Sequence, residues 1–299
     1  MKQILVGPAN SLIDFTLRCV ANPKDDVILS DPCFPTYSSV ISYQDLSPIF
    51  IPLLPENKFR MDPNEIEKKI TPKTKIIIIN SPNNPTGGYL NKDDINHIYK
   101  IAEDNNLFIL SDEVYSKLIF NGTCYSPSTI DLCRTRTIIL NSMSKSFSMA
   151  GWRVGYCVGP EKLIEKMTLL LQTILSCLPP FTQVASAKVL NMGEDFIQKV
   201  KIEYKERATL LVEGLNKLNG INCLMPAGAL YVFPKLDTSF MNTFDYSKKI
   251  LEEEGVCLLP GEYFGKSGSG HLRLSFSSTS KNDINLALRK MHSFHSKYF

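Results

Sequence analysis

The sequence predicts an α/β fold: a mostly parallel sheet flanked by helices, followed by a smaller C-terminal α+β domain. Short β-rich runs alternate with helical patterns through residue 158, as in sheets wrapped by crossover helices. After Pro179 and Pro180 the pattern changes to long helical stretches. The chain of 299 residues also exceeds the usual size of one simple core. We therefore expect a large domain over residues 1–200 and a small domain over residues 201–299.

Seven β-rich runs define the predicted sheet of the large domain. Four helical candidates lie between them, placed as crossover connections would be. Because ligands of such sheets bind at the carboxyl ends of the strands, we expect the functional residues there. The predicted strands are residues 3–6, 27–30, 49–53, 75–80, 107–111, 137–141 and 154–158, and the predicted helices are residues 11–21, 62–70, 92–104 and 161–175.

The C-terminal third of the sequence predicts a connecting helix and a small sheet. Of two helical stretches after the proline pair, the second runs from about residue 195 to 218 with few breakers, as expected of a helix that joins two domains. The remaining elements are predicted strands near residues 229–233, 256–259 and 272–276 and a closing helix over about residues 281–295.

Composition excludes several classes of partner. The 33 Lys and Arg residues nearly balance the 30 Asp and Glu residues, so bulk charge predicts neither a nucleic-acid partner nor a membrane partner. The sequence has no charged-then-apolar leader at Met1 and no apolar run long enough to span a bilayer. The eight cysteines are scattered without CxxC pairs, so we interpret them as reduced core residues rather than metal ligands. These features predict a cytoplasmic protein and no metal site.

Lys145 is the first chemical candidate, in the segment Ser142-x-x-Lys145 directly after the predicted strand 137–141. A lysine at a strand end, partly desolvated near a second cation, favours the free amine that condenses with carbonyl compounds. Arg153, eight residues on, can supply that second charge. The alternatives are a solvated loop lysine and an arginine in a surface ion pair.

Polar residues also follow two other predicted strands. Asp112 and Tyr115 lie just after strand 107–111, where the aspartate can instead cap a turn and the tyrosine can be a buried structural residue. Glu113 points the other way in an extended segment and is not a candidate. Asn84 belongs to Ser-Pro-Asn-Asn-Pro-Thr-Gly-Gly, which follows the apolar strand 75–80 and by itself indicates only a proline-constrained turn.

Four further residues complete the set of candidates. Backbone N–H groups at Ala9 and Asn10, between the first strand and a helix, can face an anion or belong to an ordinary helix cap. Phe34 follows the second predicted strand. Its ring can stack on a bound aromatic ligand, or it can be a core residue. Arg273 alternates with leucines in strand 272–276, where a buried guanidinium is costly unless it is paired, either with a ligand or with a nearby glutamate.

Together these segments resemble the class I and II aminotransferases, which depend on pyridoxal 5'-phosphate and have the aspartate aminotransferase fold (fold type I). The most specific segments are Ser142-x-x-Lys145 with Arg153 and Asn84-Pro-Thr-Gly. The resemblance runs in the same order from about Ile4 to the C-terminus. Relatives have, before this point, a segment that contributes a substrate-side loop, part of the dimer and a tyrosine that reaches the neighbouring subunit's phosphate. The resemblance implies a homodimer.

The resemblance implies a role for each cofactor residue. Lys145 is implied as the Schiff-base lysine, with Ser142 and Arg153 on the cofactor phosphate. Asp112 is implied to pair with the pyridine nitrogen, which makes the ring an electron sink. Tyr115 is implied to donate to the phenolic oxygen of the cofactor.

The remaining roles concern the phosphate, the ring face and the substrate. Asn84 is implied to donate to the same phenolic oxygen as Tyr115 and to lie at the substrate. Ala9 and Asn10 belong to the turn that the family uses for the phosphate, although Pro8 lacks an N–H. Phe34 is implied to stack on the pyridine, and Arg273 to bind the substrate carboxylate.

The reaction implied is transfer of an amino group between an amino acid and a 2-oxo acid. Lys145, freed from the cofactor, is expected to move the proton at the substrate Cα. The same residues also serve a lyase or decarboxylase that uses this cofactor. A protein of this fold that binds the cofactor without turnover is the other alternative.

Overall fold

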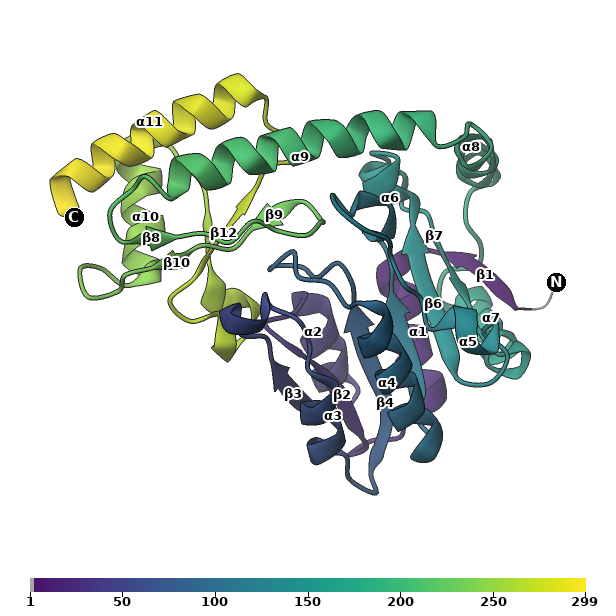
Figure 1. The fold of residues 1–299 in the computed structure, drawn as a ribbon. Coiled ribbons are helices and arrows are strands. Elements are labelled where there is room, and N and C mark those ends of the chain that lie inside the picture. Colours follow the sequence, from purple (N-terminus) through teal and green to yellow (C-terminus); the bar gives the residue numbers. More distant parts are fainter. Residues whose placement is uncertain (1–2) are drawn as a thin grey trace.

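The protein consists of a seven-stranded sheet with helices on both faces and a smaller C-terminal part (Figure 1). The structure is a computed structural model, and it describes residues 3–299. The long helix α9 (Asp195–Leu215) runs from the sheet-containing part into the C-terminal part, where it packs on α11 (Lys281–Tyr298). This arrangement confirms the predicted fold class. The division into domains at residue 200 stays a prediction.

The large sheet has the strand order β1-β7-β6-β5-β4-β2-β3. Strand β7 runs antiparallel to both of its neighbours, β1 and β6, and the other neighbouring strands are parallel. The sheet is therefore mostly parallel, as predicted. Its strands are β1 (Ile4–Gly7), β2 (Asp26–Asp31), β3 (Ser47–Pro52), β4 (Thr74–Asn80), β5 (Phe108–Asp112), β6 (Thr137–Ser142) and β7 (Gly155–Val158).

Helices cover the two faces of this sheet and connect its strands. Short 3-10 turns lie at residues 55–57, 116–118 and 150–152. The helices of this part are α1 (Ala9–Val20), α2 (Pro35–Tyr43), α3 (Pro63–Lys69), α4 (Lys92–Asp104), α5 (Ser128–Asp131), α6 (Met143–Ser146), α7 (Glu161–Ile174) and α8 (Pro180–Leu190).

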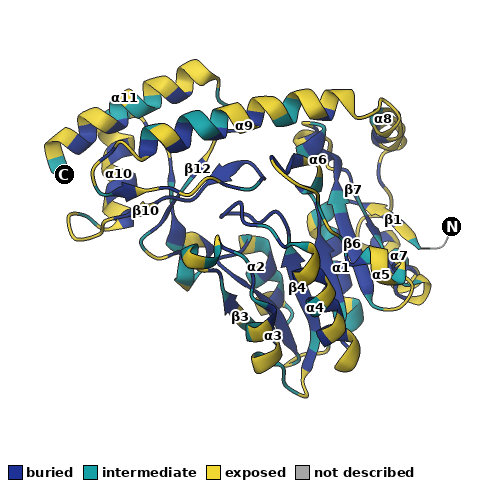
Figure 2. Cartoon of the chain, in the orientation of Figure 1, coloured by how far each residue is buried: buried dark blue, intermediate teal, exposed yellow. Residues whose placement is uncertain are grey.

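Alternating side chains divide the interior around the sheet into two apolar cores. In β4, Ile76 and Ile78 face the core formed with α1, α2 and α7, whereas Ile77 and Ile79 face the core formed with α3 and α4. Such continuous apolar strands are typical of parallel sheets that are covered on both faces. Figure 2 shows the central strands buried, with many of the exposed residues on the outer sides of the helices.

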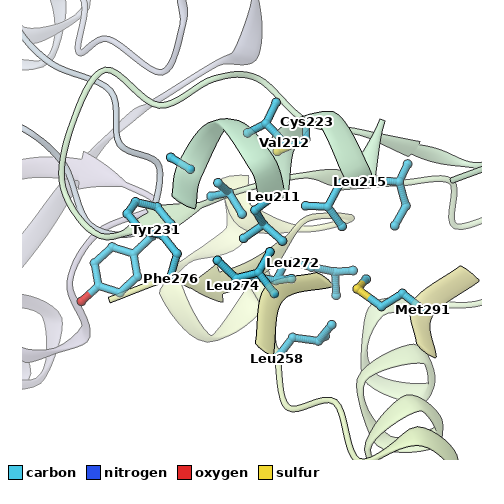
Figure 3. Packing of buried hydrophobic residues seen from close by; sticks show 14 of the residues in the cluster. Leu211, Val212, Leu215, Cys223, Tyr231, Leu258, Leu272, Leu274, Phe276 and Met291 are labelled. Carbon is cyan, nitrogen blue, oxygen red and sulfur yellow. The ribbon is translucent and has the colours of Figure 1, made fainter. Parts of the chain in front are cut away.

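The C-terminal part has two small antiparallel sheets packed between helices. Strand β12 (Leu272–Ser275) lies between β11 (Leu259–Pro260) and β9 (Tyr231–Val232), and β8 (Ile221–Asn222) pairs with β10 (Lys235–Leu236). Their apolar side chains pack against α9, α10 (Thr243–Glu254) and α11 (Figure 3). The same cluster includes Tyr115 and Leu118, which follow β5, so the two parts of the chain share one core.

The sequence predicted the long elements well and missed some of the short ones. Each of the seven strands predicted for the large sheet, and each helix that was predicted with bounds, is present within a few residues of those bounds. The prediction omitted the helices α2, α5, α6 and α10 and the short strands β8 and β10. Pro35 occupies the first turn of α2, where its missing N–H costs nothing. The strands predicted near 229–233 and 256–259 are each two residues long, at 231–232 and 259–260.

Helix α9 ends three residues earlier than predicted. The side chain of Asn216 accepts a hydrogen bond from the N–H of Cys223 (2.7 Å) and donates to its carbonyl oxygen (3.0 Å). These bonds fold the chain back toward β8 directly after Leu215. A side chain that bonds backbone groups in this way competes with continuation of the helix.

The interpretation of all eight cysteines as core residues was only partly right. All eight are unpaired, but Cys177 and Cys257 are exposed and Cys19 and Cys124 are half-buried. In residues 3–299, no three potential ligands among His, Cys, Asp and Glu gather closely enough to hold a metal ion. Over the same residues, none of the helices combines the length and the apolar character required to cross a bilayer.

Glu113 is a buried carboxyl that follows β5 and shares the face of Ser111. Its Oε1 accepts a hydrogen bond from the Ser111 hydroxyl (3.0 Å). Burial raises the pKa of Glu113 to about 7, against the opposing effect of side-chain hydrogen bonds from Ser126 and Ser111. The charged form is therefore disfavoured in the folded protein.

We predict that Glu113→Gln increases the free energy of unfolding more at pH 8 than at pH 5. Because the folded pKa lies above the unfolded value, this group lowers the free energy of unfolding as the pH rises through the interval between about 4.5 and 7. A neutral amide at this position does not ionise, so this decrease in the free energy of unfolding, at most about 3 kcal/mol, is absent in the variant. Urea unfolding at both pH values measures the difference. The exposed Glu56→Gln is the control, and an equal response of both variants would contradict the prediction.

Candidate functional site

A cavity of about 240 Å³ lies at the carboxyl ends of the sheet strands, at the junction with the C-terminal part. Its walls come from segments that are far apart in the sequence, which the fold brings to one edge of the sheet. The ten residues singled out from the sequence all line it: Ala9, Asn10, Phe34, Asn84, Asp112, Tyr115, Ser142, Lys145, Arg153 and Arg273.

Asp112, the last residue of β5, places a buried carboxylate in this cavity. Its Oδ2 accepts a hydrogen bond from the Tyr37 hydroxyl (2.5 Å), and its Oδ1 accepts one from the N–H of Val114 (3.2 Å). Burial raises the pKa of Asp112 to about 6, while these two hydrogen bonds and the charge of Lys145 act in the opposite direction. Asp112 is therefore mainly ionised at neutral pH, although it is almost fully buried.

Lys145 is held on α6, a single helical turn directly after β6. The Ser142 hydroxyl accepts a hydrogen bond from the N–H of Ser144 (3.1 Å) and so caps this turn. The Lys145 Nζ lies 5.9 Å from the centre of the Tyr115 ring. In the part of the chain that the structure describes, no carboxylate lies within ion-pair distance of this amine. The amine is thus held in the cavity without a fixed charge partner.

Asn80 forms hydrogen bonds with both Asn84 and Asp112 and so connects these two candidate segments. Its Oδ1 accepts a hydrogen bond from the N–H of Asn84 (2.9 Å), and its Nδ2 donates to the carbonyl oxygen of Asp112 (3.1 Å). The turn that carries Asn84 is held from the other side by Ala227, whose N–H donates to the carbonyl of Gly87 (3.0 Å). Gly87 has φ +72°, and a Cβ there would lie 2.4 Å from the Cβ of a neighbouring proline.

One end of the cavity is rich in hydrogen-bond donors. The first turn of α1 contributes Ala9 and Asn10, whose N–H groups have no acceptor within the helix. Gly155 allows β7 to approach this turn, because a Cβ there would lie 3.2 Å from the Cβ and 3.3 Å from the backbone nitrogen of Ala9. Arg153 adds an exposed guanidinium, whose Nη1 donates to the carbonyl of Ala150 (2.9 Å). This end can receive an anion.

Arg273 lies between two aromatic rings at the other side of the cavity. Its guanidinium carbon is 4.6 Å from the ring centre of Tyr231 and 4.5 Å from that of Phe264. Its Nη1 donates to Asn84 Oδ1 (3.3 Å), and its buried Nε has no partner. Burial lowers the pKa of Arg273. Within residues 3–299 it forms no ion pair with a glutamate, which was the structural alternative.

Three lining residues were not recognised as site residues from the sequence. Tyr37 lies on the unpredicted helix α2, one turn after Phe34, and only the fold brings it to Asp112. Asn80 ends a very apolar strand, and a polar residue at that position is a signal that sequence reasoning could have used. Tyr231 lies in a predicted strand, but its contacts are with residues distant in sequence.

Comparison with known proteins gives a consistent family assignment. The profile of the family described as aminotransferase class I and II matches residues 2–291. The chain is 38% identical over 269 residues to the aspartate aminotransferase of Pyrococcus horikoshii, covering 89% of this chain and 68% of that protein. It is 35% identical over 280 residues to the aromatic-amino-acid aminotransferase 2 of Thermococcus litoralis, covering 93% of this chain and 69% of that protein.

A solved structure shares the fold over nearly the whole chain. The aromatic aminotransferase of Pyrococcus horikoshii OT3 superposes with a TM-score of 0.94 at 31% sequence identity. The match covers 99% of this chain and 80% of that chain. The similarity therefore includes both the sheet and the C-terminal part.

We predict that Tyr37→Phe raises the pKa of Asp112 above its value of about 6. The Tyr37 hydroxyl donates to the carboxylate and so stabilises its charged form. Loss of a hydrogen bond to a charged carboxylate corresponds to a rise of about 1 unit or more in its pKa. Carbon NMR of protein labelled at the aspartate carboxyl carbons measures the titration, with Asp112→Asn to assign the signal. The exposed Tyr43→Phe should leave it unchanged, and an unaltered pKa in Tyr37→Phe would refute this role.

Proposed function

The chain belongs to the family of class I and II aminotransferases, and from this premise we propose which residues perform its reaction. Members of the family depend on pyridoxal phosphate, and the chain is a transaminase that moves an amino group between an amino acid and a 2-oxo acid. One observation carries the assignment of roles. Lys145, Asp112 and Arg273 line a single cavity, and neither Lys145 nor Arg273 has a carboxylate partner among the described residues.

The donor-rich end of the cavity suits the phosphate of pyridoxal phosphate. We assign the phosphate to the first turn of α1, at Ala9 and Asn10, together with the Ser142 hydroxyl and the Arg153 guanidinium. Helix N-termini and guanidinium groups are preferred partners of phosphate oxygens. The close approach of β7 at Gly155 brings Ser142 and Arg153 near this turn.

Asp112 suits the pyridine nitrogen, because a buried carboxylate favours a protonated ring nitrogen beside it. When bound, pyridoxal phosphate supplies an electron sink that stabilises the negative charge left at the substrate Cα. Tyr37 keeps Asp112 ionised through its hydrogen bond. We assign the ring face to Phe34, which lines the same cavity and packs edge-to-face on Tyr37 with 5.6 Å between ring centres.

Tyr115 and Asn84 suit the phenolic oxygen of the cofactor. Both are buried, and both line the cavity. The Asn84 Oδ1 accepts a hydrogen bond from Arg273, which leaves its Nδ2 free to donate into the cavity. The backbone of Asn84 is fixed by Asn80, so the direction of this amide is set before any ligand binds.

Arg273 binds the α-carboxylate of both substrates in this proposal. Its half-buried guanidinium lies between two rings and lacks an acidic partner among the described residues, so a carboxylate ligand would offset its desolvation. Fixing the carboxylate also fixes which bond at Cα stands perpendicular to the cofactor ring. Lys145 would hold the cofactor through its Nζ, and this amine, released when the amino group of the substrate takes its place, would take the proton from the substrate Cα.

We also propose that the protein is a cytoplasmic homodimer. The eight unpaired cysteines support a reducing compartment. A groove of about 680 Å³ is lined by the exposed side chains of Trp152, Leu175 and Phe181 and also by Arg153, which lines the first cavity too. Burying this apolar groove against a second copy would bring that copy close to the phosphate end of the site.

Lys145→Ala is predicted to abolish both amino-group transfer and covalent retention of pyridoxal phosphate. Without the amine no bond to the cofactor aldehyde can form, whereas the half-buried position leaves the fold intact. Reduction with borohydride followed by mass spectrometry detects the adduct, and a panel of amino acids with 2-oxo acids detects transfer. Lys188→Ala on α8 is the control. Turnover at the wild-type rate in Lys145→Ala would disprove the mechanism.

For the homodimer, we predict a mass of about twice 33.6 kDa by light scattering. Phe181→Lys should shift it to that of the monomer, because a charge at this exposed ring prevents its burial. Leu251→Lys, on the exposed side of α10 in the C-terminal part, is the matched control and should stay dimeric. A monomeric wild-type protein, or a dimeric Phe181→Lys, would contradict this interface.

A further inference from the structure

Tyr231 contacts two of the proposed site residues at once. The Arg273 guanidinium lies over the face of its ring, 4.6 Å from the centre, and its hydroxyl is 3.1 Å from the hydroxyl of Tyr115. The two tyrosine rings meet edge-to-face, with 6.1 Å between their centres. Tyr231 is therefore the side chain that connects the proposed carboxylate site with the proposed phenolic-oxygen site.

The backbone around Tyr231 fixes both contacts. In the β9–β12 pair, Tyr231 stands opposite Ser275, so Arg273 is its diagonal neighbour on the same face. The preceding segment is bonded to the chain that follows Tyr115, since the N–H of Ala229 donates to Leu118 (3.2 Å). Figure 3 shows Tyr231 at the edge of the apolar cluster, with its hydroxyl directed away from the other side chains.

Electrostatics decides which of the two hydroxyl groups donates. The cation over the Tyr231 ring withdraws electron density and strengthens its O–H as a donor. Tyr115 has the opposite surroundings. Burial raises its pKa well above the ordinary value, and the negative charge of Asp112 adds to this effect, against an opposing effect of Arg273. Tyr115 is thus the better acceptor of the pair.

We propose that Tyr231 is a positioning residue with two separate tasks, one for its ring and one for its hydroxyl. The ring holds the Arg273 guanidinium in place for the substrate carboxylate. The hydroxyl donates to the Tyr115 oxygen, which leaves the single proton of Tyr115 free to point at the phenolic oxygen of the cofactor. This inference rests on the proposed function, because it assigns a role toward the same cofactor and substrate.

Two substitutions separate the two tasks. Tyr231→Phe keeps the ring and removes the hydroxyl. It should raise the pH midpoint of the visible absorbance of the cofactor-bound enzyme by about 0.3 to 1 unit, because Tyr115 becomes a weaker donor. Binding of a desamino substrate analogue, succinate or 3-phenylpropionate, should change less than about twofold because the cation–π contact remains.

Tyr231→Leu removes the ring as well as the hydroxyl. It should shift the midpoint in the same direction and weaken binding of the analogue by about fivefold to thirtyfold. Phe264→Leu is the matched control, since Phe264 covers the opposite face of Arg273 without bonding Tyr115. It should weaken analogue binding by a similar factor and leave the pH midpoint where it is. Calorimetry measures binding, and absorbance titration measures the midpoint.

The outcomes distinguish this inference from the proposed function. If the wild-type enzyme shows no cofactor absorbance that responds to amino donors, the proposed function itself fails. If the wild-type enzyme responds but Tyr231→Phe leaves the midpoint unchanged or lowers it, the hydroxyl task is refuted. If Phe264→Leu shifts the midpoint as much as Tyr231→Phe does, both effects reflect general loosening of the site, and Tyr231 has no specific role.

Discussion

The site depends on keeping a buried carboxylate and a half-buried guanidinium in one cavity without pairing them with each other. Asp112 and Arg273 both line the cavity, and neither forms an ion pair among residues 3–299. The groups in direct contact with each charge are neutral instead: a phenol and a backbone N–H for Asp112, and two aromatic faces and the Asn84 amide oxygen for Arg273. These neutral contacts offset part of the desolvation of the two charges. They leave Asp112 available to a cationic ring nitrogen and Arg273 available to a carboxylate.

The fold keeps these charges apart by carrying them on different parts of the chain. Asp112 ends a central strand of the parallel sheet, whereas Arg273 lies on β12 of the C-terminal part. The segment 226–229 sets their relative position, because it bonds both the Asn84 turn and the chain after Tyr115. Gly228 permits this contact, since a Cβ there would lie 2.6 Å from the carbonyl oxygen of Leu118.

The sequence predicted what local chemistry determines and missed what distant contacts determine. Apolar periodicity located the strands of the sheet, and polar residues at their carboxyl ends located Asp112 and Lys145. The supporting residues carry no such signal. In the sequence, Tyr37 is an aromatic residue near prolines and Tyr231 is one position of a short predicted strand, and neither pattern indicates a site residue. Their roles depend on which side chains the folded chain places 2.5 to 3.1 Å from their hydroxyl groups.

The two tyrosines that the sequence did not indicate have related physical roles. Tyr37 donates to Asp112 and so favours its charged form, and Tyr231 stands between Arg273 and the hydroxyl of Tyr115. A phenol offers an apolar ring for packing and one donor of fixed direction, with little side-chain entropy to lose. Such groups can fix a charge in a buried site without neutralising it, whereas an acidic or basic supporting residue would compete with the ligand. The same requirement explains why the supporting groups around both charges are neutral.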